Sequence, residues 1–244
     1  MEVQLELTSR VEDEHFWFRG FRAFIDPLVR DAASRRPNPR ILDCGCGTGY
    51  NLQWLARYGR PFGFDLTPGG LALARGRGQR VVRASITDMP FGGGTADVLT
   101  SFDVLQYVED DGAVLREMAR VLAPGGALIV TAAAMDALRG GHAAEWPEVR
   151  RYSRARIRRI AEAAGLRVER ATYMFASLFP MMLAVRALRR NVEGDAPGDD
   201  WEMQVPAAPL NAVLTGMLKA EAALTRRLPM APAGSSVLLV ALKS

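Results

Sequence analysis

The sequence predicts an α/β fold, a doubly wound parallel sheet with helices between its strands. Short apolar runs typical of buried strands alternate with amphipathic stretches typical of helices. A glycine-rich turn joins the first of these strands to the helix that follows it. The chain has 244 residues, 49% of them hydrophobic, which suits one domain over residues 1–244 with a modest insertion. The expected strands of the core are residues 41–44, 60–65, 80–84, 97–101 and 127–133.

The amino-terminal segment, residues 1–37, is expected to be helical. Its apolar residues recur at i, i+4, i+7, i+8 and i+11, a spacing that places them on one helix face. That stripe consists of Trp17, Phe21, Phe24, Ile25 and Leu28. The helix should end before the Pro-Asn-Pro break at residues 37–39, because a proline cannot continue a helix.

Two later helices carry start or stop signals. Residues 111–122 have an apolar face, and we expect Pro124-Gly125-Gly126 to end that helix. In the second helix Ser153 can cap the start and Gly165 can stop the end. We interpret the face of this second helix that carries Arg154, Arg156, Arg158 and Arg159 as solvated, not as a nucleic-acid patch.

The carboxy-terminal third departs from the strand–helix alternation. Strands are expected at residues 166–173 and 236–242, so that residues 136–173 complete the sheet and 236–244 close it. Residues 174–235 between them hold an apolar stretch, an acidic loop and a further helix. Because the insertion leaves the edge where open α/β sheets bind ligands, we expect it to form a helical lid over a pocket.

Composition excludes several classes of site. The net charge is +4, but 29 of the 31 basic residues are scattered arginines, which we attribute to genome composition and not to nucleic-acid binding. Cys44 and Cys46 are two residues apart and have no other partner, so no disulfide framework is expected. With His15 and His142 as the only histidines, no metal site is expected. There is no signal-peptide pattern and no run of the roughly 18 apolar residues that a membrane span needs, so the expected location is the cytoplasm.

The glycine-rich turn carries the strongest functional signal. The strand that ends at Asp43 leads into Gly45, Gly47 and Gly49 before a helix that begins near Tyr50. Glycines allow close approach of a ligand, and the helix start offers free N–H groups. The spacing is not the G-x-G-x-x-G of dinucleotide-binding proteins, because Tyr50 stands in the sixth place. The D-x-G-x-G-x-G pattern instead resembles motif I of the class I S-adenosylmethionine-dependent methyltransferases.

Further segments resemble the same family in the same order over residues 38–135, the expected cofactor-binding core. The resemblance implies a Rossmann-like sheet of seven strands with the last one antiparallel, S-adenosylmethionine as cofactor and S-adenosylhomocysteine as product. It implies that Asp65 binds the ribose and Asp88 the adenine amino group. Asp43 has the alternative role of bonding only the backbone of the glycine loop. The cofactor-binding residues that it implies are Asp43, Gly45, Cys46, Gly47, Asp65, Leu66, Asp88, Met89, Ser101 and Phe102.

The catalytic base, if one is needed, is not identified by the sequence. His15 and Tyr107 are candidates. As alternatives, His15 is an exposed residue at a helix start, and Tyr107 is an aromatic residue of the core. Asp103 has the alternative of holding the methionine end of the cofactor. His142 lies in an expected loop, where a surface role is favoured. The substrate-pocket residues that we expect are His15, Phe16, Phe18, Asp103, Tyr107 and Tyr152.

The acceptor is predicted to be a small, hydrophobic molecule such as a lipid or secondary metabolite. Residues 174–190 are apolar and end in Arg186, Arg189 and Arg190, which suits a lid helix and, as an alternative, peripheral membrane contact. A nicotinamide oxidoreductase is excluded, since the fingerprint and a Tyr-x-x-x-Lys pair are absent. A non-catalytic module with the cofactor fold and an RNA methyltransferase remain alternatives, and the sequence does not indicate the oligomeric state.

Overall fold

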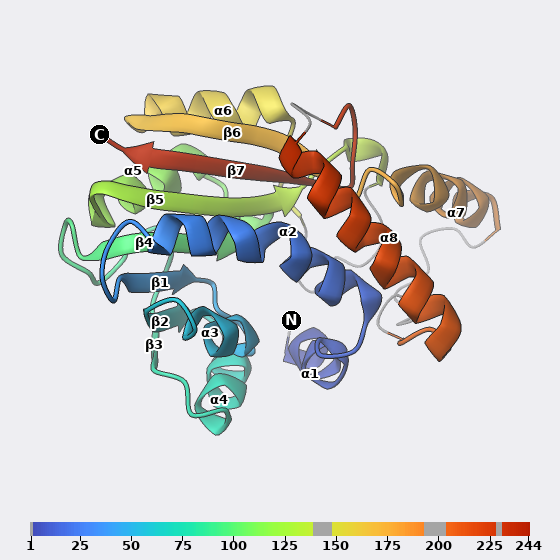
Figure 1. Cartoon of the computed structure of the whole chain (residues 1–244), viewed down its shortest axis with the longest axis horizontal. Helices are drawn as coiled ribbons and strands as arrows, with labels where there is room; N and C mark the ends of the chain where they lie inside the picture. Colours follow the sequence, from blue (N-terminus) through green and yellow to red (C-terminus); the bar gives the residue numbers. More distant parts are fainter. Residues whose placement is uncertain (1, 139–147, 193–203, 228–230) are drawn as a thin grey trace.

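The computed structural model describes residues 2–138, 148–192, 204–227 and 231–244. Its centre is a seven-stranded sheet in the order β3-β2-β1-β4-β5-β7-β6 (Figure 1). The strands are β1 (Arg40–Cys44), β2 (Arg60–Asp65), β3 (Val81–Arg83), β4 (Ala96–Phe102), β5 (Leu122–Ala133), β6 (Leu166–Met174) and β7 (Ser236–Lys243). β1 to β5 pair in parallel, and β7 is antiparallel to β5 and β6. The expected fold class is therefore confirmed, including the antiparallel last strand.

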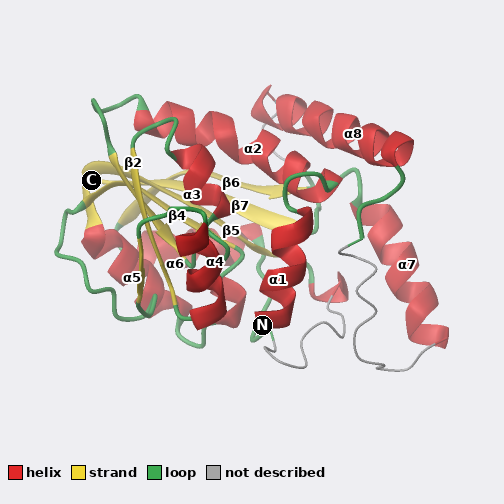
Figure 2. Ribbon diagram, turned by 90° about the horizontal axis from the view of Figure 1, so that it is seen from below, coloured by secondary structure: helices red, strands yellow, loops and turns green. Residues whose placement is uncertain are grey.

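Helices cover both faces of the sheet (Figure 2). They are α1 (Glu2–Val11), α2 (Phe16–Ala33), α3 (Tyr50–Leu55), α4 (Pro68–Gly76), α5 (Asp111–Val121), α6 (Arg154–Ala163), α7 (Phe179–Val192) and α8 (Ala208–Arg227), with 3-10 turns at Leu105–Tyr107 and Asp136–Leu138. One core layer joins the sheet to α5 and α6. The other joins it to α2, α3, α4 and α8.

The ends of α6 follow the local signals in the sequence. The Ser153 side chain accepts a hydrogen bond from Arg156 N at 3.2 Å, and Gly165 has a φ of +81° just after the helix. The solvated-face prediction needs a correction. Only Arg158 and Arg159 are exposed, because Arg156 pairs with Asp111 at 2.9 Å and Arg154 lies over the Tyr173 ring.

The Pro124-Gly125-Gly126 segment lies inside a strand. α5 ends at Val121 and β5 begins at once at Leu122, five residues earlier than the expected strand. The register opposite β4 jumps from the Ala96–Leu122 pair to the Val98–Ala127 pair, so the intervening residues bulge out of the ladder. The positive φ of +72° at Gly125 permits that bulge.

The two helices of the insertion have different positions. In the sheet, β7 lies between β5 and β6 and is antiparallel to both. β6 therefore runs in the same direction as β1 to β5. The insertion therefore leaves the ligand-binding edge, as expected. α8 packs along α2, where a Cβ added to Gly20 would lie 2.3 Å from Leu218 Cδ1. Among the described residues, the helix of the insertion that reaches the cavity described below is α7.

Membrane spanning was examined over the described ranges. No helix there is both long enough and apolar enough to cross a bilayer.

Candidate functional site

A cavity of about 970 Å³ opens at the carboxyl ends of β1, β2 and β4. The sheet order reverses between β1 and β4, which is the point where doubly wound sheets bind ligands. The cavity continues past the glycine loop to α2 and α7. The predicted site residues that line it are His15, Phe16, Phe18, Gly45, Cys46, Gly47, Asp65, Leu66, Phe102, Asp103 and Tyr107.

The glycine loop cannot carry side chains at its key position. Gly45 has a φ of +77°, and a Cβ there would lie 2.4 Å from Val104 Cγ2. Gly45 N and Cys46 N both donate to Phe64 O, at 2.9 and 3.0 Å. The loop is thus held between the ends of β2 and β4, with its backbone facing the cavity.

Asp65 at the end of β2 is held by three donors. Its Oδ2 accepts from Gly47 N at 2.9 Å, and its Oδ1 accepts from Thr67 N at 2.8 Å and Thr67 Oγ1 at 2.6 Å. These bonds fix the carboxylate at the cavity wall next to the loop. A carboxylate in this position can accept hydrogen bonds from paired hydroxyl groups.

Asp43 lies beneath the loop and does not line the cavity. Its side chain is 1% exposed; Oδ1 accepts from Thr100 Oγ1 at 2.7 Å, and Oδ2 accepts no hydrogen bond from any described residue. Burial raises the pKa of Asp43 to about 7. The alternative that Asp43 bonds the loop backbone is also not met, because its one hydrogen bond from a described residue comes from Thr100 of β4.

Three other predicted cofactor residues lie outside the cavity. Asp88 is exposed, Met89 belongs to the core, and Ser101 is fully buried within β4. A backbone bridge between Ser85 and Asp88 closes a tight turn. The three residues before Asp88 in this turn lie at the cavity. The residues of this segment that line it are Ser85, Ile86 and Thr87, which the motif comparison missed by one to three positions.

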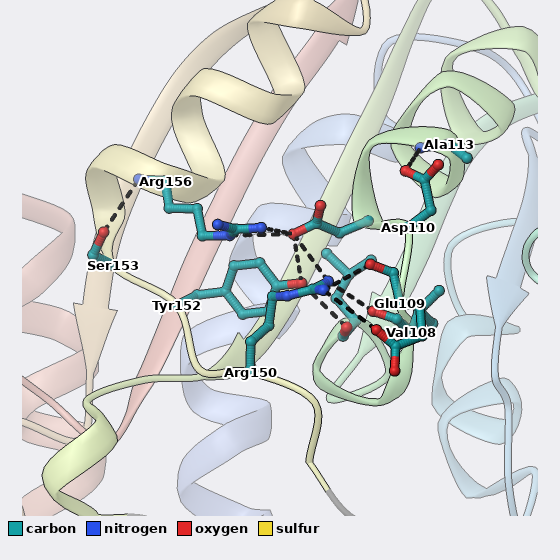
Figure 3. Close-up of polar contacts among 10 residues, drawn as sticks. Val108, Glu109, Asp110, Ala113, Arg150, Tyr152, Ser153 and Arg156 are labelled. Carbon is teal, nitrogen blue, oxygen red and sulfur yellow. Dashed lines mark hydrogen bonds and ion pairs between the residues drawn. The ribbon is translucent and has the colours of Figure 1, made fainter.

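Tyr152 is a core residue and not a pocket residue, and Figure 3 shows the polar contacts around it. It is 1% exposed, and its hydroxyl lies 3.1 Å from both Leu105 O and Asp111 Oδ2. Arg150 and Arg156 also contact Asp111, so the tyrosine ends in a buried polar cluster. Burial raises the pKa of Tyr152, which keeps the phenol neutral. The pocket prediction for Tyr152 is wrong: the residue bridges to Ala134, and its side chain packs in the core layer that also holds Ala134.

The amino-terminal helix α1 reaches over the glycine loop, which the sequence did not reveal. Leu5, Thr8 and Glu12 line the cavity. Glu12 is 5% exposed; its carboxylate accepts from Thr48 Oγ1 at 2.9 and 3.0 Å and pairs with Arg77 at 2.6 Å. Burial raises the pKa of Glu12, and Arg77 opposes that shift. Glu12 lies in the turn after α1, and no pattern in the sequence distinguishes this glutamate from an exposed one.

The far part of the cavity, which we call the acceptor half, has an aromatic and apolar wall. Phe21 and Phe102 meet edge to face at 5.1 Å, and Met181, Met182 and Val185 of α7 line the cavity as well. Lining residues missed by the sequence prediction also include Trp17, Phe21, Gln106, Glu148, Arg151, Leu178, Gln204 and Ser235.

The two candidate bases have distinct environments. His15 is 4% exposed and caps α2, its Nδ1 accepting from Trp17 N at 3.2 Å. Burial lowers the pKa of His15, so its imidazole is neutral near pH 7. Burial raises the pKa of Tyr107. Both therefore face the acceptor half in neutral form. His142 and the side chains of Arg186, Arg189 and Arg190 lie outside the described part of the structure.

The cysteines and acidic groups show no metal-type cluster. Cys44 and Cys46 are free and buried, and burial raises the pKa of both thiols. Within the described ranges, no group of three or more His, Cys, Asp or Glu side chains could hold a metal ion.

Known proteins are similar to this chain in sequence and in fold. A family model described as a methyltransferase domain matches residues 42–130. A probable S-adenosylmethionine-dependent methyltransferase of Mycolicibacterium smegmatis is 28% identical over 164 residues, which are 64% of this chain and 62% of that protein. The chain carries a class I S-adenosylmethionine-dependent methyltransferase domain.

Two further comparisons describe the methyltransferase domain. The demethylmenaquinone methyltransferase of Mycolicibacterium vanbaalenii is 35% identical over 118 residues, 48% of each chain. The structure of an S-adenosylmethionine-dependent methyltransferase from Mesorhizobium loti has a TM-score of 0.54 at 19% identity and covers 90% of this chain and 97% of that one. The matched part spans less than two thirds of the length of either curated relative.

The residues of the methyltransferase domain fit the cofactor of its family. The loop at Gly45 has no room for a Cβ beside Val104, so it presents backbone to the cavity, and Asp65 is hydrogen-bonded to Gly47 of the same loop. Ser85, Ile86 and Thr87 line the same half of the cavity. We call this part, from the glycine loop to these residues, the cofactor half.

Proposed function

We propose that the protein is an enzyme that transfers a methyl group from S-adenosylmethionine to a small, apolar acceptor. One observation carries the proposal. A single cavity joins the glycine loop and Asp65 to an apolar wall formed by α2 and α7. A cofactor and an acceptor can therefore meet without passing through solvent, as in-line transfer requires.

The cofactor, when bound, supplies the activated methyl group. The work of this chain is binding, orientation and exclusion of water. Asp65 and the backbone of Gly45 and Gly47 would hold the polar part of the cofactor. α1, through Leu5 and Thr8, and α7, through Met182, would cover the cavity.

The apolar acceptor is supported by the side chains of the acceptor half. Methionine side chains adapt to irregular apolar ligands, and α7 presents Met181 and Met182. The relative from Mycolicibacterium vanbaalenii is named a demethylmenaquinone methyltransferase, which is consistent with a small-molecule acceptor. We retain the lid role for residues 174–235, with α7 as its covering helix, and a cytoplasmic location as parts of this proposal. Membrane contact through 174–190 remains the alternative.

Calorimetric titration with S-adenosylmethionine tests the proposal. Wild-type protein should bind it, and Asp65→Ala should weaken binding by about 10- to 100-fold, because it removes a carboxylate that would face the ribose hydroxyls. Asp88→Ala is the matched control, since Asp88 is exposed outside the cavity and its loss should change the affinity less than twofold.

Two results would contradict the proposal. One is the absence of binding to wild-type protein, and the other is equal affinity of the Asp65 and Asp88 variants. A protein that binds the cofactor but forms no S-adenosylhomocysteine with any acceptor would be a non-catalytic module. Saturable RNA binding with a steep salt dependence would instead favour an RNA methyltransferase.

A further inference from the structure

We propose that Asp103 takes the proton of the methyl acceptor, and that this acceptor is an apolar molecule with a hydroxyl group, of the phenol type. The inference rests on the proposed function and adds a catalytic residue and a substrate class to it.

The position of Asp103 is set by the glycine loop. Asp103 follows the last residue of β4, and the next residue, Val104, packs against Gly45 so closely that no Cβ fits there. Asp103 thus lies on the cavity wall at the junction of the cofactor and acceptor halves. Its backbone has a φ of +55° and donates from N to Thr131 O at 3.0 Å. A side-chain-bearing residue in this conformation is uncommon, and such residues cluster at functional sites.

None of the other carboxylates of the cavity is as well placed for the acceptor: Asp65 belongs to the cofactor half, Glu12 and Glu148 form ion pairs, and Glu109 is exposed. Asp65 accepts three hydrogen bonds, Glu12 pairs with Arg77, and Glu148 forms a two-point contact with Arg151 at 2.7 and 2.9 Å. Glu109 is exposed to solvent, with Arg150 Nη2 at 3.9 Å from its carboxylate.

Asp103 keeps acceptor capacity for a ligand. Its Oδ1 accepts from Thr131 Oγ1 at 3.2 Å, and no arginine or lysine of the described ranges forms an ion pair with it. A carboxylate has about four lone-pair sites, so one hydroxyl bond leaves most of them for the acceptor.

The surroundings suit a base at neutral pH. Burial raises the pKa of Asp103 to about 6, the Thr131 hydrogen bond and Arg151 act in the opposite direction, and Glu148 adds to the rise. A carboxylate with this pKa is mostly ionised at pH 7 and binds a proton more tightly than an ordinary aspartate. Tyr107 and His15, the two candidate bases from the sequence, are neutral there, because burial raises the pKa of the tyrosine and lowers that of the histidine.

The chemistry of transfer favours a hydroxyl acceptor. As the acceptor oxygen forms its bond to the methyl carbon, its O–H bond breaks and the proton passes to Asp103, while the electron pair of the broken carbon–sulfur bond stays on sulfur. A carboxylate acceptor needs no base, and a neutral amine already has a free lone pair. The rings of Phe21 and Phe102, which line the same cavity as Asp103, favour an aromatic acceptor, because aromatic rings associate edge to face.

The test compares 4-butylphenol with 4-butylbenzoate, which differ in whether a proton must leave. Radiolabelled methyl transfer is measured with wild-type protein and with Asp103→Asn. We expect transfer to the phenol with a kcat that falls about 100- to 1,000-fold in the variant. The affinity for S-adenosylmethionine should stay within twofold. Asparagine tolerates the left-handed backbone, so the variant should fold, which circular dichroism checks.

The pH profile separates a base from a structural residue. Wild-type kcat/KM for the phenol should rise with pH through about 6 and then level, because the ionised carboxylate is the active form. Thr131→Val should move this limb to higher pH, since the lost hydrogen bond favoured the ionised form. The limb should be missing in Asp103→Asn.

Three results would overturn the inference. They are a variant rate above one third of wild type, a wild-type profile without this limb, and a wild-type protein that binds the cofactor but methylates the benzoate alone or neither probe. Absence of cofactor binding would instead count against the proposed function.

Discussion

The two halves of the cavity are built in different ways. The carboxylate of the cofactor half, Asp65, is held by Gly47 and by Thr67, within 18 residues of chain. The acceptor half is supported from outside the cavity by Asn211 of α8, which accepts from Phe16 N at 2.8 Å and donates to Glu14 O at 2.9 Å, across 195 and 197 residues. The cofactor half is thus a local motif, and the acceptor half is an assembly of distant segments. A local motif can be recognised in a sequence, whereas an assembly depends on the whole fold.

The largest expected effect concerns Asp43, and it tests whether the cofactor half depends only on residues that are near each other in the sequence. Asp43 lies under the loop, but its hydrogen-bond partner Thr100 belongs to β4. Its pKa of about 7 in the folded state, against 3.8 unfolded, means that the folded state binds the proton more tightly. The unfolding free energy should therefore fall as pH rises from about 4 to 7, by up to about 4 kcal/mol.

Asp43→Asn should remove this slope, which urea unfolding at several pH values measures. The comparison uses the slope and not the absolute stability, because the new amide group also needs a partner. Equal slopes in wild-type and variant protein would show that Asp43 does not titrate in this range.

A backbone substitution tests the loop itself. Gly45→Ala should cost about 3 kcal/mol of stability and abolish cofactor binding, because the residue would be strained at φ +77° and would collide with Val104. Gly76→Ala is the control, since a Cβ there meets no atom within 4 Å. Urea unfolding and calorimetry would contradict the account if the two variants behaved alike.

The contact between α1 and the loop tests the boundary of the cofactor half. Glu12→Ala leaves Thr48 and Arg77 without their carboxylate, and we expect a loss of about 2 kcal/mol. The affinity for S-adenosylmethionine should also fall, which would extend this half to α1. Glu6→Ala, at an exposed position of α1, the helix that ends just before Glu12, should change neither property. An unchanged affinity in the Glu12 variant would confine the cofactor half to the loop.

The smallest effect is expected in the acceptor half. Asn211→Ala removes both bonds to the start of α2 and should cost about 1 kcal/mol. Binding of S-adenosylmethionine should stay within twofold, because the change lies on the acceptor side. Val213→Ala, at a position of α8 that is 67% exposed, is the control. Weaker cofactor binding in the Asn211 variant alone would show that the halves are coupled.

Sequence reasoning was accurate where hydrogen bonds and burial are local. The strand–helix alternation, the Ser153 cap and the glycine turn were all predicted near their observed places. It was inaccurate where a side chain could turn either way. Tyr152 was predicted in the pocket and lies in the core, while Asp88 was predicted at the cofactor and is exposed.

The sequence by itself determined the sheet, the helix ends and the loop with Asp65, because strand patterning, caps and glycine conformations depend on neighbours along the chain. The tertiary structure decided that Glu12 is buried against Arg77, that Asn211 supports the start of α2, and which groups surround Asp103. These three features depend on which residues, distant in the sequence, pack around each polar side chain and exclude water from it. The sequence thus shows where the carboxyl groups stand along the chain, but the packing around each group sets its proton affinity.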